Sequence, residues 1–364
     1  MASFDITPVL ELMVEKNGSD LFFSTGAAVH MSIEGDFVPV NTQALTPGVI
    51  KEVAYGLMSP QQIKEFEVNL ESNFALSKKN VGRFRVNVFL QRGEVGMVIR
   101  HIKTEIPNFE SLGLPSILGD FVMRKRGLIL VVGSTDSGKS TTLASMIDYR
   151  NTYANGHIVT IEDPIEFVYQ HKKSIVDQRE VGIDTLSFNS ALKNAMRQAP
   201  NVILIGEIRD IDAMQQALAY AETGHLCLAT LHANNANQAL ERIISFFPPE
   251  SKNGLLLNLS LNLAAVVSQR LIPGKQKKRV AAFEILINTP YISELIKQQN
   301  LSEIKEIMAD SNDVGMQTFD QALYTLFMDS QIDENKALIH ADSRNDLSLK
   351  IRFNAERELG SFSI

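Results

Sequence analysis

One octapeptide in the middle of the chain constrains the fold more than any other stretch. It places two glycines, a lysine and a hydroxyl at fixed spacing: Gly133, Ser134, Thr135, Asp136, Ser137, Gly138, Lys139 and Ser140. This pattern is typical of a P-loop, whose backbone N–H groups wrap phosphates at the positive end of a helix. In such a loop Lys139 reaches the terminal phosphates and Ser140 holds Mg²⁺. The octapeptide and the following Thr141 therefore predict a nucleoside triphosphate site.

The residues on either side of the loop support this prediction. Residues 128–132 form an unbroken apolar run, which predicts a strand buried on both faces. Residues 141–147 carry an apolar stripe at helical spacing. Strand, loop and helix thus follow in the order that a P-loop requires, whereas a chance glycine turn would not need these flanks. Asp136 puts a carboxylate in an anion-binding loop, so we expect its side chain to point outward.

Composition narrows the class of protein. The chain has 364 residues, enough for two or three domains, with 45% hydrophobic and 21% charged residues. Its formal charge of −7 argues against general binding to nucleic acid or to an anionic membrane. The single cysteine, Cys227, excludes an internal disulfide and lies in an apolar run, so we expect a buried thiol. No apolar run is long enough to cross a bilayer, and we expect a soluble, cytoplasmic protein.

The N-terminal part of the chain reads as a small α+β domain, residues 1–104. Two helical stretches, residues 8–14 and residues 48–68 with a break at Pro60, accompany several short strands. The predicted strands are residues 20–24, 29–33, 37–40, 83–90 and 96–100. Residues 105–118, rich in proline and turn residues, are predicted to be a hinge.

The second part, residues 119–342, alternates strands with helices. The predicted strands after the P-loop are residues 158–161, 202–205 and 225–232, and the intervening helices are residues 188–196 and 214–221. This alternation predicts a mainly parallel sheet that binds ligands at the C-terminal ends of its strands. Beyond residue 235 we expect mostly helix. In the tail, residues 343–364, the alternation over residues 347–353 predicts an edge strand followed by a mobile end.

Carboxylates follow two of these strands. Glu207 comes after residues 202–205, the position from which an acid reaches Mg²⁺ through water. Glu162, Asp163 and Glu166 surround Pro164 after the preceding strand, and each is a candidate base. A turn or capping role is the alternative for any of the three.

Two histidines flank one predicted strand. His225 and His232 lie seven residues apart, which places them on opposite faces of a regular strand, and Cys227 offers no third ligand. Zinc binding is therefore not expected. His232, at the C-terminal end, is the better candidate to sense a γ-phosphate, and a hydrogen-bonded polar residue at a strand end is the alternative.

Arginines offer a further candidate group. Arg83, Arg85, Arg92 and Arg100 lie in the first domain, and such arginines could stabilise transition-state charge on a neighbour's nucleotide. Taken alone they favour the solvated face of a sheet. Arg209 is nearer to the P-loop in sequence and is equally ambiguous.

Together these blocks resemble the secretion-type ATPases that power type IV pili, in particular the retraction ATPases of the PilT/PilU family. Residues 133–140 match the Walker A motif of the family and residues 160–166 its Asp box. Residues 203–210 are similar to its Walker B motif and residues 223–232 to its His box. The resemblance covers roughly residues 5 to 340, and four ordered motifs carry it.

The resemblance implies an α/β fold in which a RecA-like P-loop NTPase core follows a smaller N-terminal PAS-like α+β domain. It implies a hexameric ring that binds ATP and Mg²⁺ between subunits and lies in the cytoplasm at the inner-membrane base of the pilus machine. The implied partners are the main retraction ATPase PilT and an inner-membrane platform protein, without nucleic acid.

The resemblance also assigns roles to residues. Lys139 binds phosphates, Ser140 and Glu207 serve the metal, and Glu166 activates water. His225 and His232 become γ-phosphate or inter-domain contacts, and the remaining residues assigned to the nucleotide site are Arg83, Arg85, Arg100 and Arg209. For the first-domain arginines this implication reverses the interpretation drawn from the residues alone.

Three departures from the family pattern favour an accessory retraction ATPase that works alongside PilT. Asp136 replaces a loop glycine, Ser293 and the acidic Glu294 stand where PilT carries arginine and asparagine, and the tail after His340 is longer. A nucleotide-binding coupling subunit with little turnover is the main alternative. An assembly ATPase would need a tetracysteine site, which one cysteine cannot build, and nothing in the sequence indicates the acceptor pocket of a small-molecule kinase.

Overall fold

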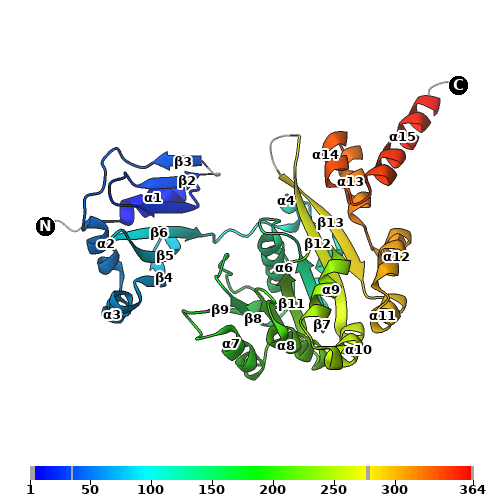
Figure 1. Cartoon of the computed structure of the whole chain (residues 1–364), viewed down its shortest axis with the longest axis horizontal. Coiled ribbons are helices and arrows are strands. Elements are labelled where there is room, and N and C mark those ends of the chain that lie inside the picture. Colours follow the sequence, from blue (N-terminus) through cyan, green and yellow to red (C-terminus); the bar gives the residue numbers. More distant parts are fainter. Residues whose placement is uncertain (1–4, 34–35, 276–278, 362–364) are drawn as a thin grey trace. The chain divides into compact units, whose positions relative to one another are not determined.

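The computed structural model describes residues 5–33, 36–275 and 279–361 and divides into two compact units (Figure 1). The N-terminal unit runs to Glu105 and includes the segments Ile165–Val168 and Gly182–Asp184. The C-terminal unit contains the rest of the chain. The stretch predicted as a hinge contains the short helix α4 (Phe109–Leu112), and a second short helix, α5 (Ile117–Val122), begins at its end.

The N-terminal unit is built on a six-stranded antiparallel sheet in the order β3-β2-β1-β6-β5-β4. The strands are β1 (Asp20–Phe23), β2 (His30–Ile33), β3 (Asp36–Pro39), β4 (Glu71–Lys78), β5 (Gly82–Gln91) and β6 (Glu94–Ile102). The helices are α1 (Thr7–Glu15), α2 (Val49–Leu57) and α3 (Pro60–Asn69). Pro60 opens α3, and Ser59 caps it with a capping box, so the break predicted at this proline is confirmed.

Alternation in β5 gives this unit its core. Phe84, Val86 and Val88 are fully buried on one face, as their spacing predicts, whereas Leu90 at the strand end is exposed. The sequence did not indicate β4, in which only Phe74 is buried, because an edge strand with one buried side chain has almost no periodic pattern.

The C-terminal unit contains a seven-stranded sheet in the order β13-β12-β7-β11-β10-β8-β9. All neighbours are parallel except β12 and β13. The strands are β7 (Gly127–Val132), β8 (Gly156–Glu162), β9 (Ser174–Glu180), β10 (Val202–Ile205), β11 (Leu226–Leu231), β12 (Leu263–Pro273) and β13 (Arg279–Ile287). Every residue of β7, β10 and β11 is buried, as central strands covered on both faces require. The predicted fold class, an α/β core after a smaller α+β domain, is confirmed.

Helices connect and cover these strands. They are α6 (Lys139–Tyr153), α7 (Phe188–Ala195), α8 (Ile211–Glu222), α9 (Ala236–Ser245), α10 (Lys252–Asn262), α11 (Pro290–Lys297), α12 (Ile304–Asp310), α13 (Phe319–Met328), α14 (Glu334–His340) and α15 (Arg344–Ser361). Short 3₁₀ turns occupy Met196–Gln198, Pro249–Ser251, Leu301–Glu303 and Asn312–Val314. Several helices begin at a side-chain cap, namely Ser187, Asp210, Asn235, Thr289, Thr318 and Asp333. Across the described ranges, no helix has both the length and the apolar content that a membrane span requires.

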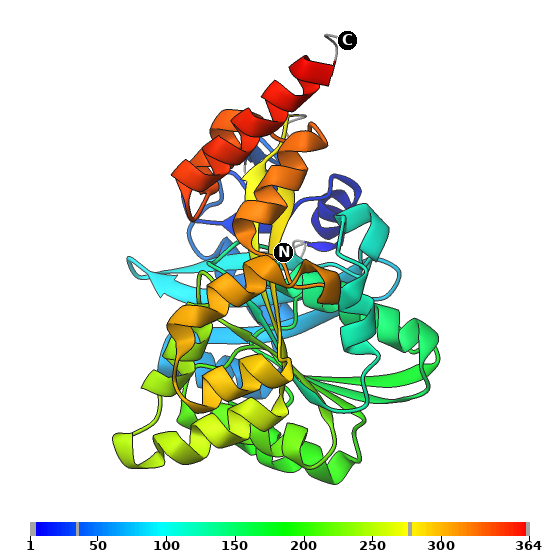
Figure 2. The ribbon, with the colours of Figure 1, turned by 90° about the vertical axis from the view of Figure 1, so that its right-hand side faces the viewer.

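One prediction for the C-terminal third is confirmed and another was wrong. The stretch after residue 235 is mostly helical, as predicted, although β12 and β13 form a long antiparallel pair at one edge of the sheet. The tail is the helix α15, which extends from the end of the unit beyond α13 and α14 (Figures 1 and 2), rather than an edge strand. Leu347 and Ile351, four residues apart, are buried against α13 and α14, whereas Leu349 and Phe353 are 53% and 65% exposed. The alternation in sequence therefore concealed a helical i, i+4 contact.

Candidate nucleotide-binding site

The P-loop connects β7 to α6, and its two glycines are required by close contacts. A Cβ on Gly133 would lie 2.4 Å from Ser137 Oγ and 2.6 Å from the Gln269 carbonyl oxygen. Gly138 precedes the first residue of α6 with a φ of 87°, and a Cβ there would lie 2.9 Å from Gln269 Nε2. A side chain at position 133 would meet the backbone of β12, and the positive φ at position 138 is one that L residues rarely adopt, so both positions favour glycine. The loop can therefore bring its backbone N–H groups close to a ligand.

Lys139 is held over the loop rather than extended into solvent. Its side chain is buried, and its Nζ donates to the carbonyl oxygens of Gly133 at 2.9 Å and Ser134 at 2.7 Å. Within the described ranges Ser137 Oγ is buried with no hydrogen-bond partner. A cation and a hydroxyl on one loop are the groups that bind a phosphate, because charge-assisted bonds to phosphate oxygens are stronger than bonds to carbonyls.

Asp136 has a backbone conformation that suits few residue types. Its φ is 60°, in the left-handed region, where aspartate and asparagine are tolerated better than most residues. The residue is exposed, as expected for a carboxylate beside an anion site. An aspartate therefore fits this position of the loop with its carboxylate accessible to solvent.

Polar side chains gather where β8, β10 and β11 end. His232 Nε2 lies 3.3 Å from Glu207 Oε1, and Arg209 Nε lies 2.7 Å from Glu207 Oε2. Arg209 also reaches Asp163 Oδ2 at 3.4 Å. The hydrogen bond to Glu207 raises the pKa of Arg209, and the Asp163 carboxylate adds to this effect. The ends of three parallel strands thus bring these four side chains together at the same edge as the P-loop.

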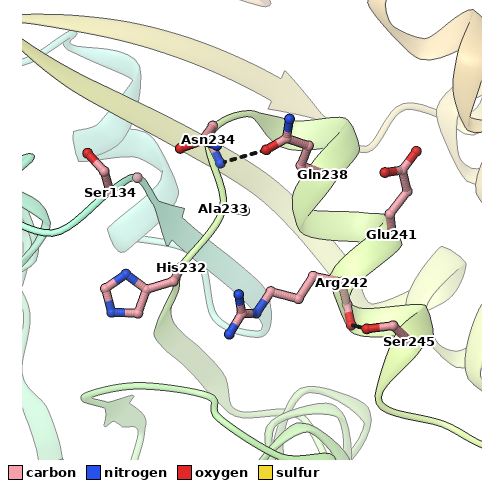
Figure 3. A pocket seen from close by; sticks show the side chains of 9 residues that line it. Ser134, His232, Ala233, Asn234, Gln238, Glu241, Arg242 and Ser245 are labelled. Atoms are coloured by element: carbon pink, nitrogen blue, oxygen red, sulfur yellow. Dashed lines mark hydrogen bonds between the residues drawn. The ribbon is translucent and has the colours of Figure 1, made fainter.

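A cavity of about 550 Å³ adjoins this cluster (Figure 3). Its lining comes from the P-loop, the residues after β11 and one face of α9: Gly133, Ser134, His232, Ala233, Asn234, Gln238, Glu241, Arg242 and Ser245. His232 and Arg242 both line it, and Figure 3 shows Arg242 extending from α9. The sequence predicted the contribution of His232 but missed that of α9, although α9 is strongly amphipathic and follows the His box directly.

Gln269 is another residue that the sequence analysis missed. It lies on β12, is only 4% exposed, and accepts a hydrogen bond from Thr142 Oγ1 at 2.8 Å. Its contacts with both P-loop glycines make it the support beneath the loop. A glutamine inside the apolar stretch around β12 was the available sign, since buried polar residues are found where they have a partner.

Two further predicted site residues have other contacts in this chain. His225 precedes β11, bonded to Thr223 Oγ1 at 3.1 Å, and the strand separates it from His232 by roughly 20 Å. The structure does not support a nucleotide contact from His225 within this chain. Glu162 accepts a hydrogen bond from Thr160 Oγ1 at 2.6 Å and another from Gln178 at 3.2 Å, which gives it a structural role along the sheet.

The N-terminal unit holds the other predicted site residues. Glu166 lies in the segment Ile165–Val168, which belongs to this unit, and is exposed. Arg85 and Arg100 are direct cross-strand partners on β5 and β6, and Arg83 precedes Arg85 by two residues on the same face. Arg100 forms an ion pair with Asp20 at 2.7 Å. These arginines lie on the face of the sheet opposite the buried side chains of β5.

The donors near the P-loop suit magnesium. Ser140 and Glu207 offer a hydroxyl and a carboxylate, the hard oxygen ligands that Mg²⁺ prefers, and Mg²⁺ commonly takes few protein ligands besides phosphates and waters. In the parts of the chain that the structure covers, no cluster of three or more His, Cys, Asp or Glu residues could hold a metal alone. Both Glu207 oxygens already have partners, which fits contact through water.

Comparison with known proteins finds secretion system proteins and pilus ATPases. Residues 4–325 match the family model described as type II/IV secretion system protein. The type IV pilus ATPase PilU of Pseudomonas aeruginosa is 52% identical over 98% of this chain and 93% of its own length. The type IV pilus retraction ATPase PilT of the same organism is 40% identical over 92% of this chain and 97% of its own length.

Solved structures of related ATPases have the same fold as this chain. The pilus retraction motor PilT with bound ADP matches with a TM-score of 0.88 and 41% identity, covering 95% of this chain and 99% of that one. The Legionella pneumophila ATPase DotB, with a TM-score of 0.79 and 24% identity over 93% and 96% of the two chains, shares the fold.

Proposed function

Because the chain belongs to the type II/IV secretion system protein family, in the group of the PilT/PilU pilus ATPases, we propose that it is a Mg²⁺-dependent ATP hydrolase. In this proposal it powers type IV pilus retraction as an accessory, PilU-type motor. The observation that carries the proposal is the shared cavity, in which the P-loop and His232 line one space while His232 is paired to Glu207.

In this proposal, each group of residues at the site has its own role in ATP hydrolysis. The P-loop amides and Lys139 bind the β- and γ-phosphates, and Lys139 exchanges its two carbonyl partners for phosphate oxygens. Mg²⁺, when bound, supplies positive charge that stabilises the negative charge developing on the phosphates. Ser140 and Glu207 would hold it. His232 donates toward the γ-phosphate, and Glu207 fixes the position of its ring.

Water activation is proposed for Glu166 by similarity to the family. Asp163, the nearest alternative, is paired with Arg209, so a base role there would require breaking an ion pair. Arg209 thereby helps to hold Glu207 and Asp163 in place. We further propose that Arg83, Arg85 and Arg100 approach a nucleotide, with Arg100 exchanging Asp20 for phosphate.

The proposal extends to the assembly. A hexameric ring, cooperation with PilT, and attachment to an inner-membrane platform protein on the cytoplasmic side all follow from the family relationship alone. The supporting feature in this chain is the high share of both chains that aligns with PilU and PilT.

A second candidate function is a nucleotide-binding coupling subunit with little turnover of its own. Ser293 favours it, because its hydroxyl donates to the Ser260 carbonyl oxygen at 2.7 Å where PilT carries an arginine. Position 293 on α11 is therefore uncharged, Lys297 at the end of the helix is paired with Glu294, and Tyr291 is exposed.

Phosphate release and ATP affinity of the purified full-length protein separate these functions. We expect Mg²⁺-dependent release, which Lys139→Ala abolishes together with ATP binding, and which Glu166→Ala abolishes while binding persists. Tight binding without release by the wild type would favour the coupling subunit. Full turnover in both variants would contradict the assigned site.

A further inference from the structure

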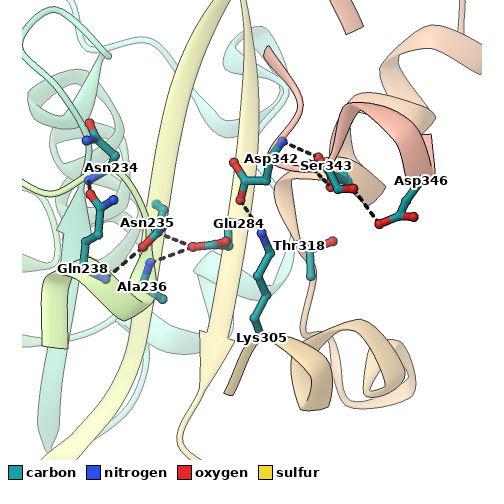
Figure 4. A network of polar contacts seen from close by, with 12 residues as sticks. Asn234, Asn235, Ala236, Gln238, Glu284, Lys305, Thr318, Asp342, Ser343 and Asp346 are labelled. Atoms are coloured by element: carbon teal, nitrogen blue, oxygen red, sulfur yellow. Dashed lines mark hydrogen bonds and ion pairs between the residues drawn. The ribbon is translucent and has the colours of Figure 1, made fainter. Parts of the chain in front are cut away.

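A buried carboxylate lies behind the wall of the cavity. Glu284, on β13, is only 2% exposed. Its Oε1 accepts hydrogen bonds from the backbone N–H of Ala236 at 2.7 Å and from Ser268 Oγ at 3.0 Å (Figure 4). Burial raises the pKa of this carboxyl, and the two hydrogen bonds counteract part of that effect. Burying this carboxyl is energetically unfavourable, and one of its two hydrogen bonds binds a backbone N–H group.

That N–H group begins the helix that lines the cavity. Ala236 is the first residue of α9, and Asn235 caps the helix by accepting from the Gln238 N–H at 2.8 Å. A carboxylate at this end also interacts favourably with the helix dipole. Residues 232–238, here called the His232 segment, connect β11 to α9 and contribute His232, Ala233, Asn234 and Gln238 to the cavity.

Arg270 holds the same segment from the neighbouring strand. It is two residues from Ser268 on β12, and its NH2 group donates to the Asn234 carbonyl oxygen at 3.4 Å. The same guanidinium donates to the His340 carbonyl oxygen at 2.9 Å and pairs with Asp342 at 2.8 Å. Asp342 in turn pairs with Lys305 at 2.9 Å. One side chain therefore joins the His232 segment to the C-terminal helices.

We propose that Glu284 and Arg270 are positioning residues that fix the His232 segment, so that His232 meets the γ-phosphate held by the P-loop. The inference rests on the proposed function and deepens it. Glu284 fixes the start of α9, and Arg270 fixes the preceding turn. Asp342 lies between α14 and α15 and pairs with Arg270, so a shift of these helices would also shift the His232 segment. The C-terminal helices can therefore change the rate of turnover without contacting the nucleotide.

A purely structural role accounts less well for this arrangement. Well-packed apolar residues often stabilise a core as much as buried charges do. Here Ser268 and Glu284 face each other across β12 and β13, and the carboxylate is directed at the His232 segment. Since both hydrogen bonds end on Oε1, glutamine can accept both without the charge.

The test measures kcat and KM for ATP in the full-length protein and its variants. Glu284→Ala should lower kcat about tenfold or more, because a small displacement of a catalytic group is costly, while KM changes less than about twofold. Glu284→Gln should restore most of the turnover. Ile285→Ala is the matched control, since it removes a buried side chain from the same strand on the opposite sheet face and should leave kcat unchanged.

Hydrogen exchange supplies a readout that needs no turnover. In Glu284→Ala, amides of residues 232–240 other than that of Ala236 should exchange faster, whereas Ile285→Ala should not change them. If Glu284→Ala matches Ile285→Ala in both kcat and exchange, the positioning role is wrong and the ATPase function stands. If the wild type neither binds nor hydrolyses ATP, the proposed function is wrong, and the exchange comparison still decides the structural part.

Discussion

His232 Nε2 lies 3.3 Å from Glu207 Oε1, and this contact joins the ends of the adjacent parallel strands β10 and β11. The same carboxylate also binds Arg209, so a single acid orients one group that can donate to a phosphate and another that is tied to Asp163. Positions so far apart in sequence meet because both strands end at the same edge of the sheet, where the P-loop also begins.

Replacing either partner should slow hydrolysis more than it weakens binding. We expect Glu207→Ala and His232→Ala each to lower Mg²⁺-dependent phosphate release about 10²-fold, because the roles proposed for both concern the reacting phosphate rather than the whole nucleotide. His225→Ala, on the other side of β11, should have the smaller effect. Phosphate release combined with titration of a fluorescent ATP analogue checks this, and equal losses in His225→Ala and His232→Ala would contradict the assignment.

Two substitutions of Asp136 distinguish the effect of its negative charge on ATP affinity from the effect of its backbone conformation on stability. Asp136→Asn keeps a residue that tolerates a φ of 60° and removes the negative charge, so ATP affinity should rise a fewfold with little change in stability. Asp136→Ala removes the same charge but should destabilise the fold by about 1 kcal/mol. Nucleotide titration and thermal unfolding of both variants test the two effects, and an unchanged affinity in both would show that the carboxylate is fully screened.

Gln269 should prove essential to the P-loop. Gln269→Leu leaves the buried Thr142 hydroxyl without its acceptor, at a cost of about 1 to 3 kcal/mol. The double variant Gln269→Leu, Thr142→Val removes both polar groups and should recover part of that loss. Unfolding free energies of the two single variants and the double variant measure the coupling, and strictly additive values would mean that the hydrogen bond contributes nothing.

The stability of the protein should depend on pH through Glu284. Burial raises its pKa above the ordinary value of 4.5, so the folded protein holds this proton at pH values where the unfolded chain has lost it. The free energy of unfolding therefore falls as pH rises from 4.5 through the raised pKa. In Glu284→Gln this decline should be absent. Denaturation midpoints across that window test it, and parallel curves for wild type and variant would contradict the sign.

Helix α15 should depend on two of the four apolar residues that alternate along it, Leu347, Leu349, Ile351 and Phe353. Leu347→Ala should destabilise the C-terminal helices by about 2 kcal/mol, because the side chain is buried against α13 and α14. Leu349→Ala on the exposed side should change stability by less than about 0.5 kcal/mol. Thermal unfolding distinguishes the helix from an edge strand, in which all four side chains of one face would be equally sensitive.

Local chemistry explains how much of the site the sequence could predict. The P-loop requires two glycines at positions where a side chain would collide, and a lysine and a serine directly after them, so its pattern lies within eight consecutive residues. Glu207 and His232 could be placed because they come two residues and one residue after fully buried strands, and consecutive apolar residues identify such strands without knowledge of their neighbours.

Contacts between distant segments could not be read in this way. Gln269 supports a loop 131 to 136 residues earlier in the chain, and Glu284 binds a helix start at Ala236, so neither has a local pattern. The strands β12 and β13 resemble helix by composition, and only pairing with β7 and with each other makes them strands. In the tail, alternation favoured a strand, and contact with α13 and α14 selected the helix.

The sequence by itself determined the phosphate-binding loop, the succession of buried strands and the family, because these depend on neighbouring residues and on hydrophobic spacing. Only the tertiary structure decided which side chains hold those parts in place. Hydrogen bonds such as those of Gln269 and Glu284 join residues that are far apart in sequence and come together only when the strands pair in their native register.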